Sequence, residues 1–167
     1  MAVKEPGPAP LGRVADLLNT DDRFHGLDLL RDPERFPRVL AHLELPADTD
    51  RDDLIRLRDA LRGIVGGESD PAALDAVASR HPLRLAVVDG ELVLRGDDGI
   101  AEVISLVQQT LAAGTFARLR SCRNPDCGWI YFDSSKNRSG RWCSTECSHV
   151  MRSRAYRSRQ AGSTNRV

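Results

Sequence analysis

Four cysteines near the end of the chain are the residues whose type and spacing could do chemistry. Cys122, Cys127, Cys143 and Cys147 are spaced C-x4-C-x15-C-x3-C, and the 167-residue sequence contains no other cysteine. Two close thiol pairs separated by about fifteen to twenty residues can supply the four ligands of a tetrahedral zinc ion. Because four protein thiolates leave no open position for water, we expect one structural Zn²⁺ rather than a catalytic one.

Other uses of the four thiols stay open at this point. An iron–sulfur cluster also takes four thiolates, and two disulfides would use the same residues. Residues 1–10 are rich in Pro and Ala and lack the apolar core of a signal peptide, so we expect a cytoplasmic protein whose thiols bind metal. His149, two residues beyond Cys147, is an alternative ligand, although a surface position is the simpler interpretation.

The residues between the two cysteine pairs indicate how the ligands are positioned. A tight knuckle is expected at residues 124–128, and residues 129–132 are β-prone. Residues 141–143 are expected to return as the second strand of a hairpin. Ser144 can then cap a helix that carries Cys147 in its first turn. The sequence therefore predicts a treble-clef-like zinc finger of knuckle, hairpin and helix.

Two tryptophans, Trp129 and Trp142, fall within this finger. Aromatic side chains on a small hairpin can stack on bases. A small zinc domain has few other large apolar groups, however, so we expect both indoles to cover the zinc core.

The run CRNPDCGWIYFDSSKNRSGRWCSTEC resembles the CGNR zinc-finger family of bacterial proteins. The matching positions are Cys122, Pro125, Cys127, Gly128, Trp129, Phe132, Asp133, Ser135, Asn137, Arg141, Trp142, Cys143, Ser144 and Cys147. The chain departs from the family after the last cysteine, where Ser148-His149-Val150 replaces Gly-Asn-Arg, and at Gly140, where a second Arg is common.

The resemblance also covers the upstream residues. Leu18-Asn19-Thr20, Asp28-Leu29-Leu30, the helix at 57–62 and the hairpin around Asp89-Gly90 look like landmarks of the ABATE-type domain that precedes the finger in this family. The resemblance implies a stress- or ligand-responsive bacterial transcription regulator. It divides the chain into an ABATE-like domain at 1–117, a finger with a basic helix at 118–160 and a tail at 161–167, which we expect to be disordered.

Charge is distributed unevenly along the chain. The formal net charge is zero, but residues 118–167 hold eleven Arg or Lys and three acidic residues, which gives +8 and leaves −8 for residues 1–117. A basic end next to a zinc finger favours a polyanionic partner, with DNA the leading candidate. Solubility alone, or attraction between the basic end and the acidic part, would also explain the pattern.

Hydrophobic periodicity predicts a mainly helical N-terminal domain with one β-hairpin, hence an α+β fold. The best helix spans about 50–65, with an apolar stripe on one side and Asp and Arg on the other. Asp89-Gly90 between residues 83–88 and 91–95 is a strong hairpin signal. Further helices are expected at 11–18, after Pro37, from 70 to 77, and from about 100 to 114.

The predicted DNA contacts lie on the helix after the last cysteine. Its arginines spread over two faces, which suits contacts with phosphates better than base reading, and Met151 and Ala155 are expected to face the body. The assigned contacts are Arg152, Arg154, Arg157 and Arg159, with Arg138 and Arg141 on the hairpin. The alternative is a zinc-stabilised protein-interaction module that does not bind DNA.

We find no sequence signature of an enzyme. The chain has no phosphate-cradling glycine loop, no metalloprotease helix and no nucleophile elbow, so we expect no catalytic activity, with a redox or transferase enzyme as the weakest option. No stretch approaches the ~20 apolar residues of a membrane span. A small-molecule effector has no identifying motif, and a homodimer is compatible with the sequence. Loss of the metal is expected to unfold the finger and to leave residues 1–117 folded.

Overall fold

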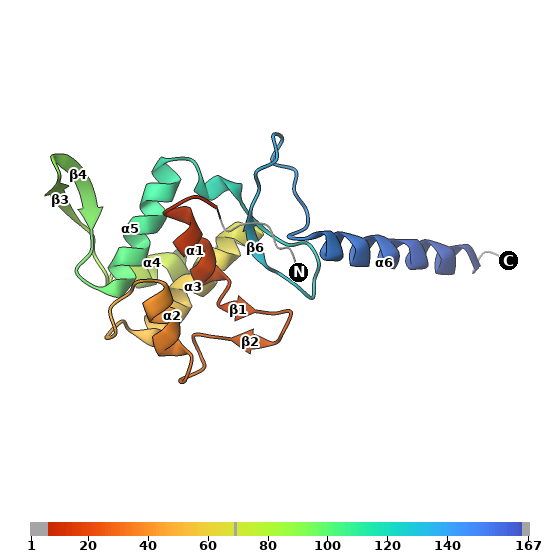
Figure 1. Ribbon diagram of the computed structural model, residues 1–167, viewed down its shortest axis with the longest axis horizontal. Coiled ribbons are helices and arrows are strands. Elements are labelled where there is room, and N and C mark those ends of the chain that lie inside the picture. Colours follow the sequence, from red (N-terminus) through yellow and green to blue (C-terminus); the bar gives the residue numbers. More distant parts are fainter. Residues whose placement is uncertain (1–6, 69, 165–167) are drawn as a thin grey trace.

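The computed structural model describes residues 7–68 and 70–164, with side chains to residue 160. A helical body occupies the centre of the molecule, a β-hairpin extends from one end, and a long C-terminal helix extends from the other (Figure 1). The helices are α1 (Leu11–Leu18), α2 (Phe36–His42), α3 (Arg51–Gly66), α4 (Pro71–Ala78), α5 (Gly99–Ala112) and α6 (Thr145–Thr164), with a 3-10 turn η1 (Phe116–Arg118). The strands are β1 (Asp21–Asp22), β2 (Leu27–Asp28), β3 (Arg84–Val88), β4 (Glu91–Arg95), β5 (Leu119–Ser121) and β6 (Ile130–Phe132).

The body is built around α1, α3 and α5, whose apolar faces form one core. The helix expected at 11–18 is α1, which buries Leu11, Val14, Leu17 and Leu18, and the predicted boundaries of α3 agree with the observed ones to within one residue. Asp50 caps α3 by accepting a hydrogen bond from the backbone N–H of Asp53, and Asp70 and Asp98 cap α4 and α5 in the same way. The sequence thus predicted the helical framework correctly.

The prediction of one hairpin in the N-terminal part is wrong, because two are present. β3 pairs with β4 through Asp89 and Gly90, both at positive φ, as the Asp-Gly signal predicts. The second hairpin pairs β1 with β2. These strands have only two residues each, and their acidic sequence gives no alternating apolar pattern from which a strand could be predicted.

The predicted hairpin of the finger has a different partner. β6 pairs with β5, which precedes the knuckle, and residues 141–143 form no strand. The pairing begins beside the knuckle, where Cys122 donates its N–H to Trp129 O, and it ends where Asp133 donates to Arg118 O. Strand β5 has only three residues, so the local sequence gives little sign of this pairing across the first cysteine pair.

The finger shares its core with the body. Leu119 and Ile130 are buried in the same apolar cluster as α1 and α3, and Phe132 packs against that cluster. Strand β5 contacts α3, and β6 contacts α1. The predicted sequence boundary at 117/118 is therefore not a boundary in packing, and this changes the expectation that residues 1–117 keep their stability without the metal.

The last helix differs from its prediction. α6 continues to Thr164, into the segment expected to be disordered, while residues 165–167 lie outside the described part. Ala155 is exposed and Met151 only half buried, so beyond its first turns α6 does not lie on the body as expected. Within the described residues, no helix is long and apolar enough to cross a membrane.

A cluster of charged groups near α4 gives the stability a pH dependence. His81 lies 2.9 Å from a carboxylate oxygen of Asp53 and 3.0 Å from one of Asp98. Partial burial opposes protonation, but hydrogen bonds to Asp98 and Asp53 outweigh it and raise the pKa of His81 above its usual 6.5. The stability that the protonated His81 side chain adds to the folded state is thus complete below pH 6.5, and it is lost as pH rises through the raised pKa. We therefore expect the free energy of unfolding to fall as pH rises through that window. Urea titrations of the His81→Gln variant at several pH values should not show this decrease. A decrease of equal size in the variant would assign the pH dependence to another group.

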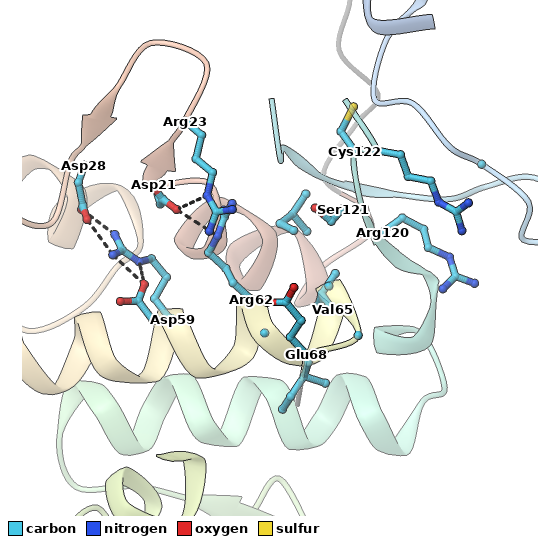
Figure 2. A pocket seen from close by; sticks show the side chains of 18 of the residues that line it. Asp21, Arg23, Asp28, Asp59, Arg62, Val65, Glu68, Arg120, Ser121 and Cys122 are labelled. Atoms are coloured by element: carbon cyan, nitrogen blue, oxygen red, sulfur yellow. Dashed lines mark hydrogen bonds and ion pairs between the residues drawn. The ribbon is translucent and has the colours of Figure 1, made fainter. Parts of the chain in front are cut away.

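A cleft of about 910 Å³ opens between the body and the finger. Figure 2 shows Arg62 on α3, Glu68 just after this helix, and Asp21 and Arg23 beside it, with Arg120 on the finger side. The cleft thus lies where the two sequence units meet.

Candidate metal centre and nucleic-acid interface

The four cysteines come together as the sequence predicts. Their sulfur atoms all lie within 4.8 Å of one another, and all four residues are buried. The Sγ atoms of Cys127 and Cys143 are 3.6 Å apart, and those of Cys143 and Cys147 are 3.8 Å apart. A zinc ion with Zn–S bonds of about 2.3 Å requires sulfur separations of about 3.8 Å in a tetrahedron. The thiols therefore fit a single structural Zn²⁺.

The close packing of the thiols favours a cation at their centre. Hydrogen bonds with Cys127 and Cys143 lower the pKa of Cys122, while hydrogen bonding to Cys122 raises the pKa of Cys127. The pKa of Cys143 is raised further for the same reason. The cluster thus favours one thiolate and opposes more. A doubly charged metal ion supplies the charge that lets the remaining thiols ionise.

The backbone around each cysteine pair is held by local hydrogen bonds. Gly128, at φ +58°, closes the knuckle, and the side chain of Ser144 accepts from the N–H of Cys147 at 3.2 Å, as predicted for the cap of α6. Asn124 points its amide toward the sulfur of Cys147 at 3.6 Å, which orients this ligand. Trp129 and Trp142 pack on the cysteine cluster, in the covering role expected for them.

A buried carboxylate organises the loop between the cysteine pairs. Asp133 is fully buried and accepts hydrogen bonds from the N–H groups of Ser135 at 3.0 Å and Gly140 at 2.7 Å. A Cβ atom at position 140 would lie 2.9 Å from this carboxylate. The close approach explains why a residue without a side chain suits this position, where the resembling family commonly has Arg.

The cysteine geometry and its loop agree with the comparison with known families. Residues 118–160 match the CGNR zinc finger. The match covers the two β-strands of the finger, all four cysteines and the arginine-bearing part of α6. It does not extend to residues 1–117, so the ABATE-type domain stays a prediction. No curated protein matches the chain significantly.

Asn19 fixes the finger to the body. Its amide donates to the carbonyl of Ile130 at 2.8 Å, and its side-chain oxygen accepts from the N–H of Ile130 at the same distance. The Asn19 side chain thus pairs with β6 as the backbone of a neighbouring strand would. The contact is buried and joins residues 111 positions apart in the sequence.

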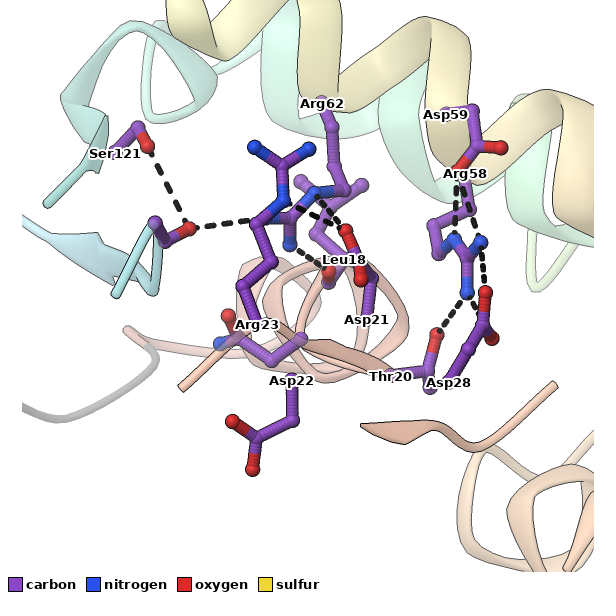
Figure 3. A network of polar contacts seen from close by, with 12 residues as sticks. Leu18, Thr20, Asp21, Asp22, Arg23, Asp28, Arg58, Asp59, Arg62 and Ser121 are labelled. Atoms are coloured by element: carbon purple, nitrogen blue, oxygen red, sulfur yellow. Dashed lines mark hydrogen bonds and ion pairs between the residues drawn. The ribbon is translucent and has the colours of Figure 1, made fainter. Parts of the chain in front are cut away.

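Arg62 of α3 makes the second link. Its guanidinium donates to the carbonyl of Leu18 at the end of α1 and to the carbonyl of Gly128 in the knuckle, the latter at 3.0 Å, while its Nε lies 3.3 Å from Asp21 (Figure 3). Only 6% of the side chain is exposed. Arg62 therefore holds α1, β1 and the metal knuckle together, although the amphipathic pattern of α3 had placed its arginines on the outer side.

Arg58, one turn earlier on α3, organises the adjoining part of the network. It makes a two-pronged ion pair with Asp28, at 2.6 and 2.8 Å, and contacts Asp59 and the hydroxyl of Thr20 (Figure 3). Its side chain is 2% exposed. Asn19, Thr20 and Asp28, which stood out as landmarks of the sequence, therefore have structural roles in joining hairpin β1–β2, α3 and the finger.

The arginines predicted to contact DNA differ in their surroundings. Arg152, Arg157 and Arg159 are exposed on α6. Arg154 is half buried and forms an ion pair with Asp126 of the knuckle. Sequence reasoning overlooked Tyr156, which is 57% exposed and lies one turn from Arg152, on the face that Arg152 and Arg159 share. The sequence did offer a signal for Tyr156, because it is an aromatic residue within a run of arginines and serines.

The two arginines on the finger loop are not part of the α6 surface. Arg141 is exposed and places its guanidinium over the ring of Trp142, 5.2 Å from its centroid. Arg138 lines the cleft beside α3, in a left-handed backbone conformation with φ of +49°. The structure therefore gathers the four cysteines into one cluster and carries four of the predicted arginines on α6. Arg138, in contrast, is separated from that helix.

Proposed function

We propose that this protein is a cytoplasmic transcription regulator that binds duplex DNA through the zinc finger and α6. The observation that carries the proposal is α6 itself. It extends from the molecule as a helix of 20 residues that begins beside the cysteine cluster (Figure 1). A helix without a packed apolar face gains little from folding alone, which suggests that its partner is another molecule.

The charge of the helix indicates which kind of partner this is. The described side chains of α6 include four arginines and one glutamate, and the body carries the balancing negative charge elsewhere. Most arginines of the body are paired with carboxylates, as Arg58 is with Asp28 and Arg80 with Asp53. Arg152 and Arg157, which are exposed on α6, therefore offer cations to a polyanion, and an α-helix fits the major groove of DNA.

The type of contact follows from what α6 offers. Its arginines occupy two faces, so they can reach phosphates on both sides of a groove. Ser148-His149-Val150 at the start of α6 lacks the long hydrogen-bonding side chains that read base edges. We infer binding that is driven mainly by phosphate contacts and that discriminates weakly between sequences.

Salt dependence tests the proposal, with Arg152 and Arg154 as a matched pair. Arg152→Ala should lower the affinity for a fluorescent duplex and reduce the slope of log K against log salt by about 0.9, because one phosphate contact is lost. Arg154→Ala should have a smaller effect, because Arg154 is already paired with Asp126. Anisotropy titrations at several salt concentrations measure both.

Two results would count against DNA binding. One is an affinity for duplex DNA that does not depend on salt in the zinc-loaded protein. The other is an unchanged affinity when Arg152 and Arg157 are both replaced by alanine while the zinc content stays at one ion per chain. Either result would favour the interaction module.

The exposed apolar face of hairpin β3–β4 supports the second candidate function, a protein-interaction module. Cross-strand neighbours in β3–β4 place Leu85, Val87 and Leu92 on one face of the hairpin, where they are 64%, 69% and 69% exposed. An apolar surface of this kind is typical of protein contacts, including contacts with another copy of the chain. Light scattering of the parent and of the Leu85→Ser/Leu92→Ser variant would decide it: a dimer that the substitutions convert to a monomer establishes the contact.

We propose no enzymatic activity for the metal centre. Its four thiolate ligands complete a tetrahedron, so no position is left for a water molecule or substrate. The zinc-loaded protein would therefore use its metal only to hold the finger and α6 in place.

A further inference from the structure

The cleft between α3 and the finger differs in its chemistry from the metal centre and from α6. It is lined by the second half of α3 and the residues just after it, by hairpin β1–β2 and its neighbours, and by the finger segments 120–123 and 138–140. Its volume of about 910 Å³ lies in the range of small-molecule sites. None of the residues assigned to DNA contacts except Arg138 lines it.

The charges on the body side of the cleft compensate one another. Arg58 is paired with Asp28 and Asp59. Asp21 accepts from Arg23 at 2.9 Å and lies 3.3 Å from Arg62 (Figure 2). This wall is rigid and close to neutral, and its arginines are committed to the network that joins body and finger.

The finger side of the cleft carries uncompensated positive charge. Arg120, Arg123 and Arg138 have no carboxylate partner among residues 7–68 and 70–160. The one hydrogen bond recorded for their guanidinium groups runs from Arg120 to the backbone oxygen of Arg138, at 3.4 Å. Three guanidinium groups that line one cleft form a site for an anion with several negative charges, and guanidinium geometry suits phosphate oxygens.

One further residue that lines the cleft has the opposite charge. Glu68, just after α3, is exposed, and no ion pair is recorded for its carboxylate within the described part of the chain. A carboxylate accepts hydrogen bonds from amino or hydroxyl groups and repels phosphate. A continuous nucleic-acid backbone therefore fits this cleft poorly, whereas a small molecule with phosphates at one end and hydrogen-bond donors at the other fits both walls.

We propose that the cleft binds a phosphorylated small molecule of the nucleotide class. Its phosphates contact Arg120, Arg123 and Arg138, and its sugar or base donors face Glu68. The ligand bridges the body and the loop of the finger that carries Arg138. This site is separate from the surface of α6 and does not depend on DNA binding.

Calorimetric titration of the zinc-loaded full chain tests the site, with inorganic pyrophosphate and ATP as probes. The Arg123→Ala/Arg138→Ala variant should bind both probes at least about tenfold more weakly, because two charge-assisted contacts are lost. The matched control is Arg38→Ala/Arg95→Ala, which removes two exposed arginines without carboxylate partners from α2 and β4, outside the cleft. The control should stay within about twofold of the parent.

Glu68→Gln separates the two ends of the ligand. It should leave pyrophosphate binding unchanged or tighter, and it should weaken ATP binding. The proposal is overturned if neither probe binds, if the control weakens binding as much as the cleft variant does, or if Glu68→Gln leaves ATP binding unaltered.

A DNA titration distinguishes this site from the regulator function. The Arg120→Ala/Arg123→Ala variant, which leaves Arg138 in place, should retain the DNA affinity of the parent, and Arg152→Ala/Arg157→Ala should retain pyrophosphate affinity. If the first variant loses DNA affinity as much as the second, the cleft belongs to the DNA surface and the small-molecule site is rejected. If no variant binds DNA and pyrophosphate still binds, the regulator proposal fails and the cleft site stands.

Discussion

The Cys143→Ser variant is expected to lose its zinc and the fold of its finger. Cys143 is fully buried, with its sulfur near those of both Cys127 and Cys147. Structural zinc contributes about 10–16 kcal/mol of apparent binding energy in small zinc fingers, and the finger has little other core to replace it. Metal analysis should find less than one zinc per chain, and amide spectra should show residues 122–147 unfolded.

The same variant should also weaken the body. Ile130 and Leu119 belong to the core of α1 and α3, and Gly128 O holds the guanidinium of Arg62. When the knuckle unfolds, these contacts are lost, so we expect the body to melt at a lower temperature. Glu146→Gln, an exposed neighbour on α6, is the control and should keep both zinc and stability. A native-like finger spectrum after complete chelation would contradict the prediction.

Arg58→Met is expected to destabilise the protein by about 3–5 kcal/mol, because it leaves a partly buried carboxylate without its main partner. Asp28 is 21% exposed, and both its oxygens accept from Arg58. Partial burial acts to raise the pKa of Asp28, but hydrogen bonds from Arg58 outweigh burial and keep that pKa below its usual value. Urea denaturation measures the loss, and the pKa of Asp28 should rise in the variant.

Arg31 supplies the matched control for this experiment. Arg31 pairs with the same two carboxylates as Arg58, at 3.0 Å to Asp28 and 3.8 Å to Asp59, but its side chain is 62% exposed. Because solvent screens exposed pairs, Arg31→Ala should change the free energy of unfolding by no more than about 1 kcal/mol. Equal losses for the two variants would show that burial does not set the strength of these pairs.

The parts of the structure that were predictable from the sequence rest on short-range chemistry. The spacing of the cysteines predicts the metal cluster, the Asp-Gly pair predicts β3–β4, and the aspartates at 50, 70 and 98 predict helix starts. In each case the residues that determine the structure are neighbours in the chain. Local pattern was therefore sufficient.

The parts that were missed depend on contacts between distant segments. Strand pairing of β6 with β5 was assigned instead to residues 141–143, because both choices suit the local sequence. Arg58 and Arg62 were placed on the outer side of α3, since a helical pattern cannot show that hairpin β1–β2 and the finger cover that side. The cleft escaped prediction for the same reason: its walls come from α3, hairpin β1–β2 and separate segments of the finger, which meet only in the folded chain.

The pairing of Asn19 with β6 limits how this finger can be exchanged between proteins. An asparagine offers one donor and one acceptor at a fixed reach, and Ile130 uses both. Aspartate would lack the donor, and glutamine would extend the group by one methylene. A finger transplanted onto another body would thus lose both partners of the Ile130 backbone and would uncover the apolar side chains of Leu119 and Ile130, which are buried here. Recombination of this module is therefore expected to succeed only when α1 and its terminal asparagine travel with it.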